Sequence, residues 1–146
     1  MPLPHHAVRS VFSVRSYEID SYAHLNNGVY IAWFEHGRQM WLKTKGYTYD
    51  SLAARKQWFV VARTEVDFRQ PLSEGQTSEL TTSIESLGRS SVRWNQTLRL
   101  LPEGPDSADP SPTDKPLVAE AVTIMVFSGE GGGSIPIPSD FRAAVE

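Results

Sequence analysis

The feature that most constrains the fold is a long stretch, residues 27–46, whose apolar side chains recur at helical spacing. The positions that follow the i, i+3, i+4, i+7 pattern are Tyr30, Trp33, Phe34, Gly37 and Trp41. Val29, Ile31 and Met40 extend the apolar surface beyond one stripe, which a helix on the surface of a protein does not need. The sequence therefore predicts a helix that other elements of the chain cover on more than one side.

Gly37 lies in the middle of this helix, where glycine costs about 1 kcal/mol relative to alanine. Close approach of a sheet at that point would compensate the cost. The helix ends are also marked in the sequence: Asn27 is the expected N-cap, Lys43 and Lys45 lie in the last turn, and Gly46 suits the position after the C-cap.

Four later segments predict β-strands, after a possible helical turn at 48–55. Residues 58–69 alternate, with Trp58, Val60, Ala62, Thr64, Val66 and Phe68 on one face and charged residues on the other. A turn containing Pro71 and Gly75 leads to strands at 78–87, 91–101 and 117–128. With a first strand within residues 7–16, the order is strand, helix and four antiparallel strands. This predicts an α+β fold, in which a curved antiparallel sheet of about five strands wraps one long helix.

The chain is expected to form one domain over residues 1–146. Residues 102–116 contain five prolines and no aromatic residue, which predicts a long mobile loop. From about residue 129 the sequence predicts a flexible C-terminal tail, with a glycine-rich linker and, at 139–146, a frayed helix at most.

Composition excludes several classes of function. The formal net charge of −3 argues against a nucleic-acid binder. No apolar stretch approaches the roughly 20 residues of a membrane span, and the N-terminus lacks the apolar core of a signal peptide. There is no cysteine, and the spacing of the four histidines matches no metal site. We expect a cytoplasmic protein without a metal or a redox cofactor.

The chemistry is concentrated in the loop before the long helix, which reads YEIDSYAHLNNGVY from residue 17 to residue 30. Asp20 could simply form an Asx turn, and His24 could simply hold the loop in shape. Asn27 could combine its role as a cap with a functional one, because the first N–H groups of a helix are unpaired and carry partial positive charge. Without a cysteine or a Gly-x-Ser-x-Gly elbow, a carboxylate is the best candidate for a base or a nucleophile.

The loop and the order of elements resemble the hot-dog fold thioesterases, in the branch of the 4-hydroxybenzoyl-CoA and long-chain acyl-CoA thioesterases. The matching positions are Asp20, His24, Asn26, Asn27 and Tyr30 in the loop, Glu35 and Arg38 in the helix, and Pro71 and Gly75 in the later turn. Ala23 stands where the family usually has glycine. The resemblance covers roughly residues 8–128.

The resemblance implies hydrolysis of a thioester to a free acid and CoA, with Asp20 as general base or nucleophile and His24 orienting it. The helix N-terminus around Asn27 and Gly28 would stabilise the oxyanion. Tyr30 is a candidate for lining the substrate pocket, and Arg89 is a candidate for holding CoA phosphates.

The partners implied are an acyl-CoA, or the thioester of an acyl carrier protein, and further copies of the chain in a dimer or tetramer. The residues also leave other functions open. One is a hot-dog dehydratase or hydratase, and another is a non-catalytic scaffold that binds acyl groups. Glu35 and Arg38, three residues apart, predict an ion pair on the helix. The sequence does not specify the length of the acyl chain.

Overall fold

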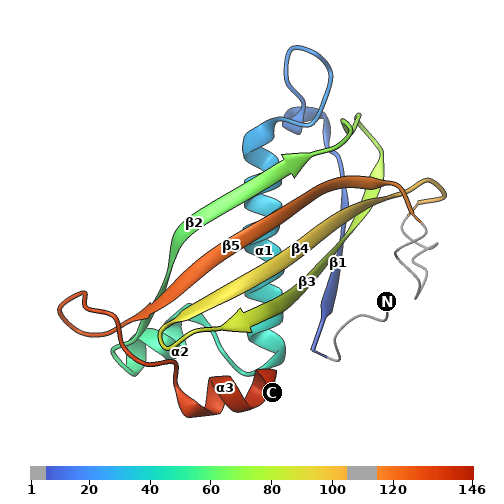
Figure 1. Ribbon diagram of the computed structural model, residues 1–146. Helices are drawn as coiled ribbons and strands as arrows, with labels where there is room; N and C mark the ends of the chain where they lie inside the picture. Colours follow the sequence, from blue (N-terminus) through green and yellow to red (C-terminus); the bar gives the residue numbers. More distant parts are fainter. Residues whose placement is uncertain (1–5, 105–114) are drawn as a thin grey trace.

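The computed structural model describes residues 6–104 and 115–146, and it shows a curved five-stranded antiparallel sheet around helix α1 (Asn27–Thr44) (Figure 1). The strands are β1 (Val8–Ser13), β2 (Trp58–Phe68), β3 (Thr77–Leu87), β4 (Ser91–Leu101) and β5 (Leu117–Ser128). The shorter helices are η1 (Ser16–Glu18), α2 (Tyr49–Ala54) and α3 (Ser139–Val145). The predicted α+β architecture is confirmed. Most of the predicted mobile loop at 102–116 lies outside the described residues. Among the residues that the structure describes, no helix is long and apolar enough to cross a membrane.

The strand order in the sheet is β1-β3-β4-β5-β2. Strand β2 therefore pairs with β5 and not with β3, the strand that follows it in the sequence. This corrects the expectation of a simple turn at 70–76. The segment instead crosses the N-terminal end of α1, where the buried Leu72 accepts a hydrogen bond from the N–H of Leu25 at 2.8 Å.

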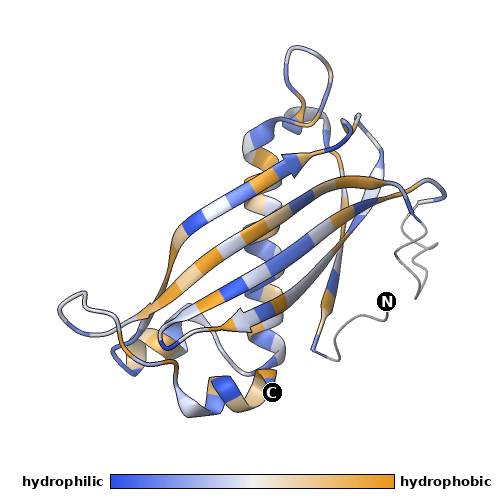
Figure 2. Ribbon diagram, in the orientation of Figure 1, coloured by the Kyte–Doolittle hydropathy of each residue, from blue (hydrophilic) through white to orange (hydrophobic). Residues whose placement is uncertain are grey.

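Strand β2 carries a bulge that changes which side chains face the core. The pairing with β5 shifts between Val61 and Arg63, so Ala62 is left out of the register. Before the bulge it is Phe59 that is buried, whereas Trp58 and Val60 are exposed. The predicted alternation was wrong in this half of the strand, because one extra residue inverts the two faces. Along β4 and β5, buried side chains alternate with more exposed ones over most of the length, and β5 is hydrophobic over much of its length (Figure 2).

Helix α1 lies against the sheet at Gly37, as predicted. A β-carbon at this position would lie 2.6 Å from Leu80 Cδ2, 2.7 Å from Thr82 Oγ1 and 2.9 Å from Gln96 Nε2. Gly46, with a φ of 84°, follows the C-terminal end of the helix as expected. At the N-terminal end the cap is Asn26 and not Asn27, because the side chain of Asn26 accepts the N–H of Gly28.

The predicted ion pair between Glu35 and Arg38 is absent from the part of the chain that the structure describes. Arg38 is only 4% exposed and turns into the core, where its Nη1 donates to Gln96 Oε1 at 3.1 Å and to Thr123 Oγ1 at 3.4 Å. Gln96 in turn donates to the carbonyl of Phe34 at 2.8 Å. These polar groups lie between two apolar clusters, one around Trp41 and Phe127 and one around Tyr30 and Leu72.

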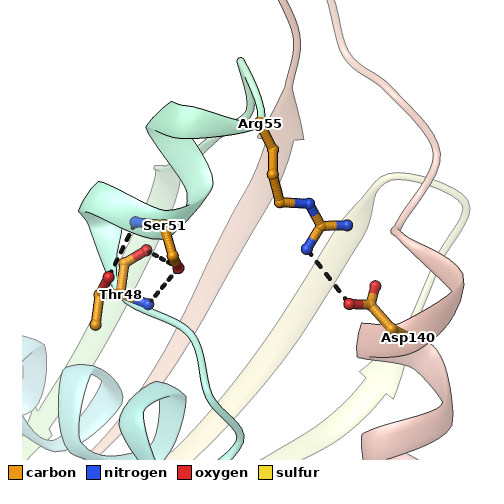
Figure 3. Close-up of polar contacts among 4 residues, drawn as sticks. All are labelled: Thr48, Ser51, Arg55 and Asp140. Carbon is orange, nitrogen blue, oxygen red and sulfur yellow. Dashed lines mark hydrogen bonds and ion pairs between the residues drawn. The ribbon is translucent and has the colours of Figure 1, made fainter.

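The C-terminal segment is packed, which corrects the expectation of a linker followed by a frayed helix. Phe141 on α3 is fully buried and stacks edge-to-face on Tyr47, Phe59 and Phe127. On the surface, the Asp140 carboxylate accepts a hydrogen bond from Arg55 of α2 at 3.3 Å (Figure 3). Ile137 belongs to the same buried cluster, and Ile135 and Val145 pack against it, so several apolar side chains hold the C-terminal segment on the core.

Candidate active site

The loop before α1 is held in place at both of its legs. Ile19 and Leu25 form an isolated antiparallel bridge across its base. The N–H of Leu25 donates to Leu72 O at 2.8 Å, and the N–H of Asn26 donates to Glu18 O at 2.9 Å. These contacts fix the short stretch from Asp20 to His24 against the end of the helix.

Asp20 bonds to its own loop through one carboxylate oxygen. Oδ1 accepts the N–H of Tyr22 at 2.9 Å and the N–H of His24 at 3.2 Å. The Asx-type turn that the sequence allowed is therefore present. The second oxygen, Oδ2, has no hydrogen-bond partner among the described residues. One oxygen thus holds the carboxylate in position, while the other is left for an incoming molecule.

Ala23, where the resembling family has glycine, adopts a left-handed backbone conformation with a φ of 61°. This conformation costs a residue other than glycine about 1 kcal/mol. The strain is balanced by the hydrogen bond from its N–H to Asp20 O at 3.0 Å and by the bridge at the base of the loop.

The first turn of α1 leaves one N–H group available. The N–H of Gly28 donates to Asn26 Oδ1 at 2.9 Å, and the N–H of Val29 donates to Asn26 O at 2.9 Å. The N–H of Asn27 has no acceptor among the described residues. This donor carries part of the positive end of the helix dipole.

The free oxygen of Asp20 and the free N–H of Asn27 belong to residues that line the same surface depression, whose volume is ≈ 270 Å³. Its lining residues are Asp20, His24, Leu25, Asn27, Tyr30, Phe68, Arg69, Gln70 and Pro71. Leu25, Tyr30, Phe68 and Pro71 give it an apolar wall. The rings of Tyr30 and Phe68 meet edge-to-face with their centroids 5.1 Å apart.

Tyr30 is 3% exposed, and the charge of Asp20 in the loop affects the pKa of its hydroxyl. Burial raises the pKa of Tyr30, and the negative charge of Asp20 acts in the same direction, whereas a hydrogen bond with the main chain of Leu72 opposes them. The phenol is therefore neutral at physiological pH. It can donate a hydrogen bond at the edge of the depression.

His24 contacts Asp20 through the main chain in both directions. Asp20 N donates to His24 O at 2.8 Å, and His24 N donates to Asp20 Oδ1. The imidazole makes no hydrogen bond within the described ranges 6–104 and 115–146. His24 therefore positions Asp20 through its backbone, and its ring is free to contact a substrate.

Two of the predicted site residues lie elsewhere. Gly28 lines a second depression of ≈ 720 Å³ on the other flank of α1, together with Phe12, Arg15 and Trp33 among others. Arg89 lies in the turn between β3 and β4, where its carbonyl accepts the N–H of Ile137 near α3. Within one chain, neither residue lines the depression that contains Asp20.

Sequence reasoning did not single out Arg69 or Gln70 for the site: Arg69 was one of five arginines that could hold CoA phosphates, and Arg89 was chosen among them. The Arg69 guanidinium donates to Glu120 Oε1 at 2.6 Å, and this hydrogen bond raises the pKa of Arg69. Pro71 was assigned to a turn between two strands, and this assignment gave no reason to place the residues before it next to the loop of Asp20. The crossing of this segment over the helix end is a tertiary feature that local turn signals do not show.

Comparisons with known proteins identify the family. The sequence profile of the thioesterase-like superfamily matches residues 14–145. The chain belongs to this superfamily. This confirms the resemblance and the predicted enzyme class, a thioester hydrolase. Among characterised relatives, the long-chain acyl-CoA thioesterase FadM of Escherichia coli (strain K12) is 28% identical over 102 residues, which cover 70% of this chain and 76% of FadM.

A second relative of this chain is the chloroplastic acyl-acyl carrier protein thioesterase ATL3 of Arabidopsis thaliana. It is 25% identical over 130 residues, which cover 89% of this chain but only 63% of ATL3.

Solved structures confirm the hot-dog fold. A 1,4-dihydroxy-2-naphthoyl-CoA thioesterase from Synechocystis superposes with a TM-score of 0.81 at 12% identity, with 95% of each chain covered. A probable thioesterase from Escherichia coli superposes with a TM-score of 0.75 at 23% identity, with 94% of this chain and 96% of the other covered.

Proposed function

We propose that this thioester hydrolase acts on acyl-CoA and that Asp20 and the N–H of Asn27 carry the reaction. The observation that supports this most directly is the depression they share. Both residues line it. Within the part of the chain that the structure describes, one oxygen of the Asp20 carboxylate has no partner, and the N–H of Asn27 is the unused one of the first helical turn. A base or nucleophile and an oxyanion donor are what thioester hydrolysis requires.

The thioester carbonyl oxygen would accept the N–H of Asn27. As a general base, Asp20 Oδ2 would take a proton from a water molecule while the water oxygen attacks the carbonyl carbon. The negative charge that develops on the carbonyl oxygen is stabilised by Asn27 and by the helix dipole. The C–S bond then breaks, and the CoA thiolate leaves and takes up a proton.

As a nucleophile, Asp20 would instead attack the carbonyl carbon itself and release the thiolate. Water would then hydrolyse the mixed anhydride that forms. Both routes consume one water and give a carboxylic acid and CoA, and both use the same carboxylate. The hydrogen bonds between the main chain of His24 and Asp20 hold the carboxylate in position, which is compatible with either route.

The acyl group would pack on Leu25, Tyr30 and Phe68, while Arg69 at the mouth of the depression places a positive charge near the leaving CoA. The Escherichia coli relative acts on long-chain acyl-CoA and the plant relative on acyl carrier protein thioesters. A CoA thioester is the substrate we favour for this chain, and the cytoplasm is its expected location.

Strand β2 supports a proposal on the oligomeric state. This strand forms one edge of the sheet, and it exposes Trp58, Val60, Val61 and Phe68 by 43–50%. Unpaired edge strands with exposed apolar side chains invite pairing with another strand. We propose a homodimer, alone or within a tetramer, in which β2 of each copy lies beside the other. Because Phe68 also lines the depression, the second copy would close its open side.

The test of the function is a thiol-release assay with purified protein over acyl-CoAs from short to long and aromatic. Release of CoA with formation of free acid is the expected result. A change in enoyl absorbance without thiol release would indicate a hydratase. Tight binding of acyl-CoA without any turnover would indicate a binding protein, and either outcome would contradict the proposal.

A further inference from the structure

Asn26 precedes α1, and three of its groups (the N–H, the carbonyl and the side-chain Oδ1) form hydrogen bonds at this helix end. Its N–H donates to Glu18 O, its carbonyl accepts the N–H of Val29, and its Oδ1 accepts the N–H of Gly28, each at 2.9 Å. The donors on both sides of Asn27 are therefore used. Among the described residues the N–H of Asn27 has no acceptor, and Asn27 lines the depression that contains Asp20.

The chemical type of this cap matters to an anion bound beside it. Aspartate caps a helix about as well as asparagine, and its negative charge interacts favourably with the helix dipole. For the stability of α1 alone, aspartate would serve equally well or better. A carboxylate at residue 26, however, would stand next to the N–H that receives the thioester oxygen, and like charges at short range repel each other.

We propose that Asn26 is a positioning residue for thioester hydrolysis. Its side-chain oxygen accepts the N–H of Gly28, so that only the N–H of Asn27 is available to the oxyanion. The accepting side chain is neutral, which avoids a negative charge beside the oxyanion. The inference rests on the proposed function. The inference adds one requirement to the proposed function: the N-cap residue of α1 must be uncharged for turnover. A charged cap would stabilise the helix equally well.

The decisive variants are Asn26→Asp and Asn26→Ser, which both keep a side-chain oxygen that can accept the N–H of Gly28. We expect Asn26→Asp to lower kcat at least 10-fold, with KM changed little and a urea midpoint equal to or above that of the unmodified protein. Asn26→Ser should retain most of the kcat that Asn26→Asp loses, since the serine cap is neutral.

One further measurement separates charge from shape. Higher ionic strength should reduce the deficit of Asn26→Asp, because salt screens the repulsion between exposed charges. A merely structural defect would not respond to salt in this way.

Thr48, the cap of α2, provides a matched control. Its Oγ1 accepts the N–H of Ser51 at 2.9 Å, as Asn26 caps α1, but at a helix end that does not line the depression (Figure 3). Thr48→Asp introduces the same charge at a cap and should leave kcat unchanged.

Each outcome decides the inference. It would be overturned by wild-type kcat in Asn26→Asp, by equal losses in the aspartate and serine variants, or by failure of Asn26→Asp to fold. If the unmodified protein releases no thiol, the proposed function fails and the inference fails with it. If the unmodified protein is active and Asp20→Asn is inactive while Asn26→Asp is unaffected, the function stands and only the role of Asn26 is wrong.

Discussion

Asp20 and His24 are joined through the main chain in both directions: Asp20 N lies 2.8 Å from His24 O, and His24 N lies 3.2 Å from Asp20 Oδ1. The carboxylate is therefore a structural part of its loop as well as the candidate catalytic group. A substitution that removes the carboxylate altogether would disturb both roles. An informative substitution must keep the acceptor and remove the charge.

Asp20→Asn satisfies this condition, because the asparagine oxygen can still accept the N–H groups of Tyr22 and His24. We expect the urea midpoint to stay close to that of the unmodified protein. Turnover should fall by about 100-fold or more, the usual scale for loss of a general base. The measurement is thiol release alongside a denaturation curve. Near-normal thiol release by the folded variant would refute the role of Asp20.

Gly37→Ala tests the contact between α1 and the sheet. Alanine would gain about 1 kcal/mol in helix propensity. Its β-carbon would however lie under 3.0 Å from atoms of Leu80, Thr82 and Gln96, all of them buried. Overpacking of this kind costs about 1–3 kcal/mol, so we expect a net loss of stability of about 1 kcal/mol in urea unfolding. As a control, Ala32→Gly on an exposed side of α1 should show only the propensity cost.

Phe141→Ala tests whether the C-terminal helix belongs to the core. Phe141 is fully buried against Tyr47, Phe59 and Phe127. Truncation of a buried phenylalanine costs about 3–5 kcal/mol, and we expect a loss in this range. Thermal unfolding of the purified variant measures it. An unchanged melting temperature would mean that α3 does not pack on the protein in solution.

These cases show which parts of the fold the sequence could predict. Helical spacing and the interior Gly37 predicted a covered helix with a close sheet contact, because periodicity and glycine cost are local signals. The pairing of β2 with β5 could not be predicted in the same way. A turn signal at Pro71 indicates that the chain changes direction there, but it does not indicate which strand pairs with β2. The bulge at Ala62 and the anchoring by Phe141 are likewise set by contacts distant in sequence.

The residues of the candidate site also fall into those that local sequence could predict and those that only tertiary contacts bring to the site. Asp20, His24, Asn27 and Tyr30 lie within eleven residues of one another (positions 20–30), and the structure brings them to one depression. Arg69 and Gln70 reach it only through the crossing of their segment over the helix end. Arg38 was expected to pair on the helix surface, but burial against Gln96 and Thr123 is decided by the sheet and not by helical spacing.

Val61→Asp tests the proposed dimer. Val61 is 50% exposed on the edge strand β2, and a charge there would oppose the approach of a second strand. We expect the variant to be monomeric at micromolar concentration, by sedimentation or light scattering, and to lose thiol release if the second copy closes the site. Val11→Asp, at a 43% exposed valine on the opposite edge strand β1, is the control and should remain a dimer. A monomeric unmodified protein with full activity would contradict the dimer.

Tyr47 provides a prediction for alkaline pH. Burial, with a smaller contribution from the Asp140 carboxylate, raises the pKa of Tyr47 from 10.0 to about 12 in the folded protein. Above pH 10 the unfolded chain releases this proton while the folded protein keeps it, so stability decreases as the pH rises. The contribution is complete below pH 10 and is lost by about pH 12, with a size on the order of 2 kcal/mol.

Tyr47→Phe removes this titration, so the difference in unfolding free energy between the two proteins isolates it from the other tyrosines. Between pH 10 and pH 12 we expect the unfolding free energy of Tyr47→Phe to rise steadily relative to that of the unmodified protein. Between pH 7 and pH 9 the difference between the two unfolding free energies should stay constant. The measurement is urea unfolding followed by tryptophan fluorescence at each pH. Curves that stay parallel up to pH 12 would show that the hydroxyl of Tyr47 titrates as freely in the folded protein as in the unfolded chain, and that α3 does not enclose it.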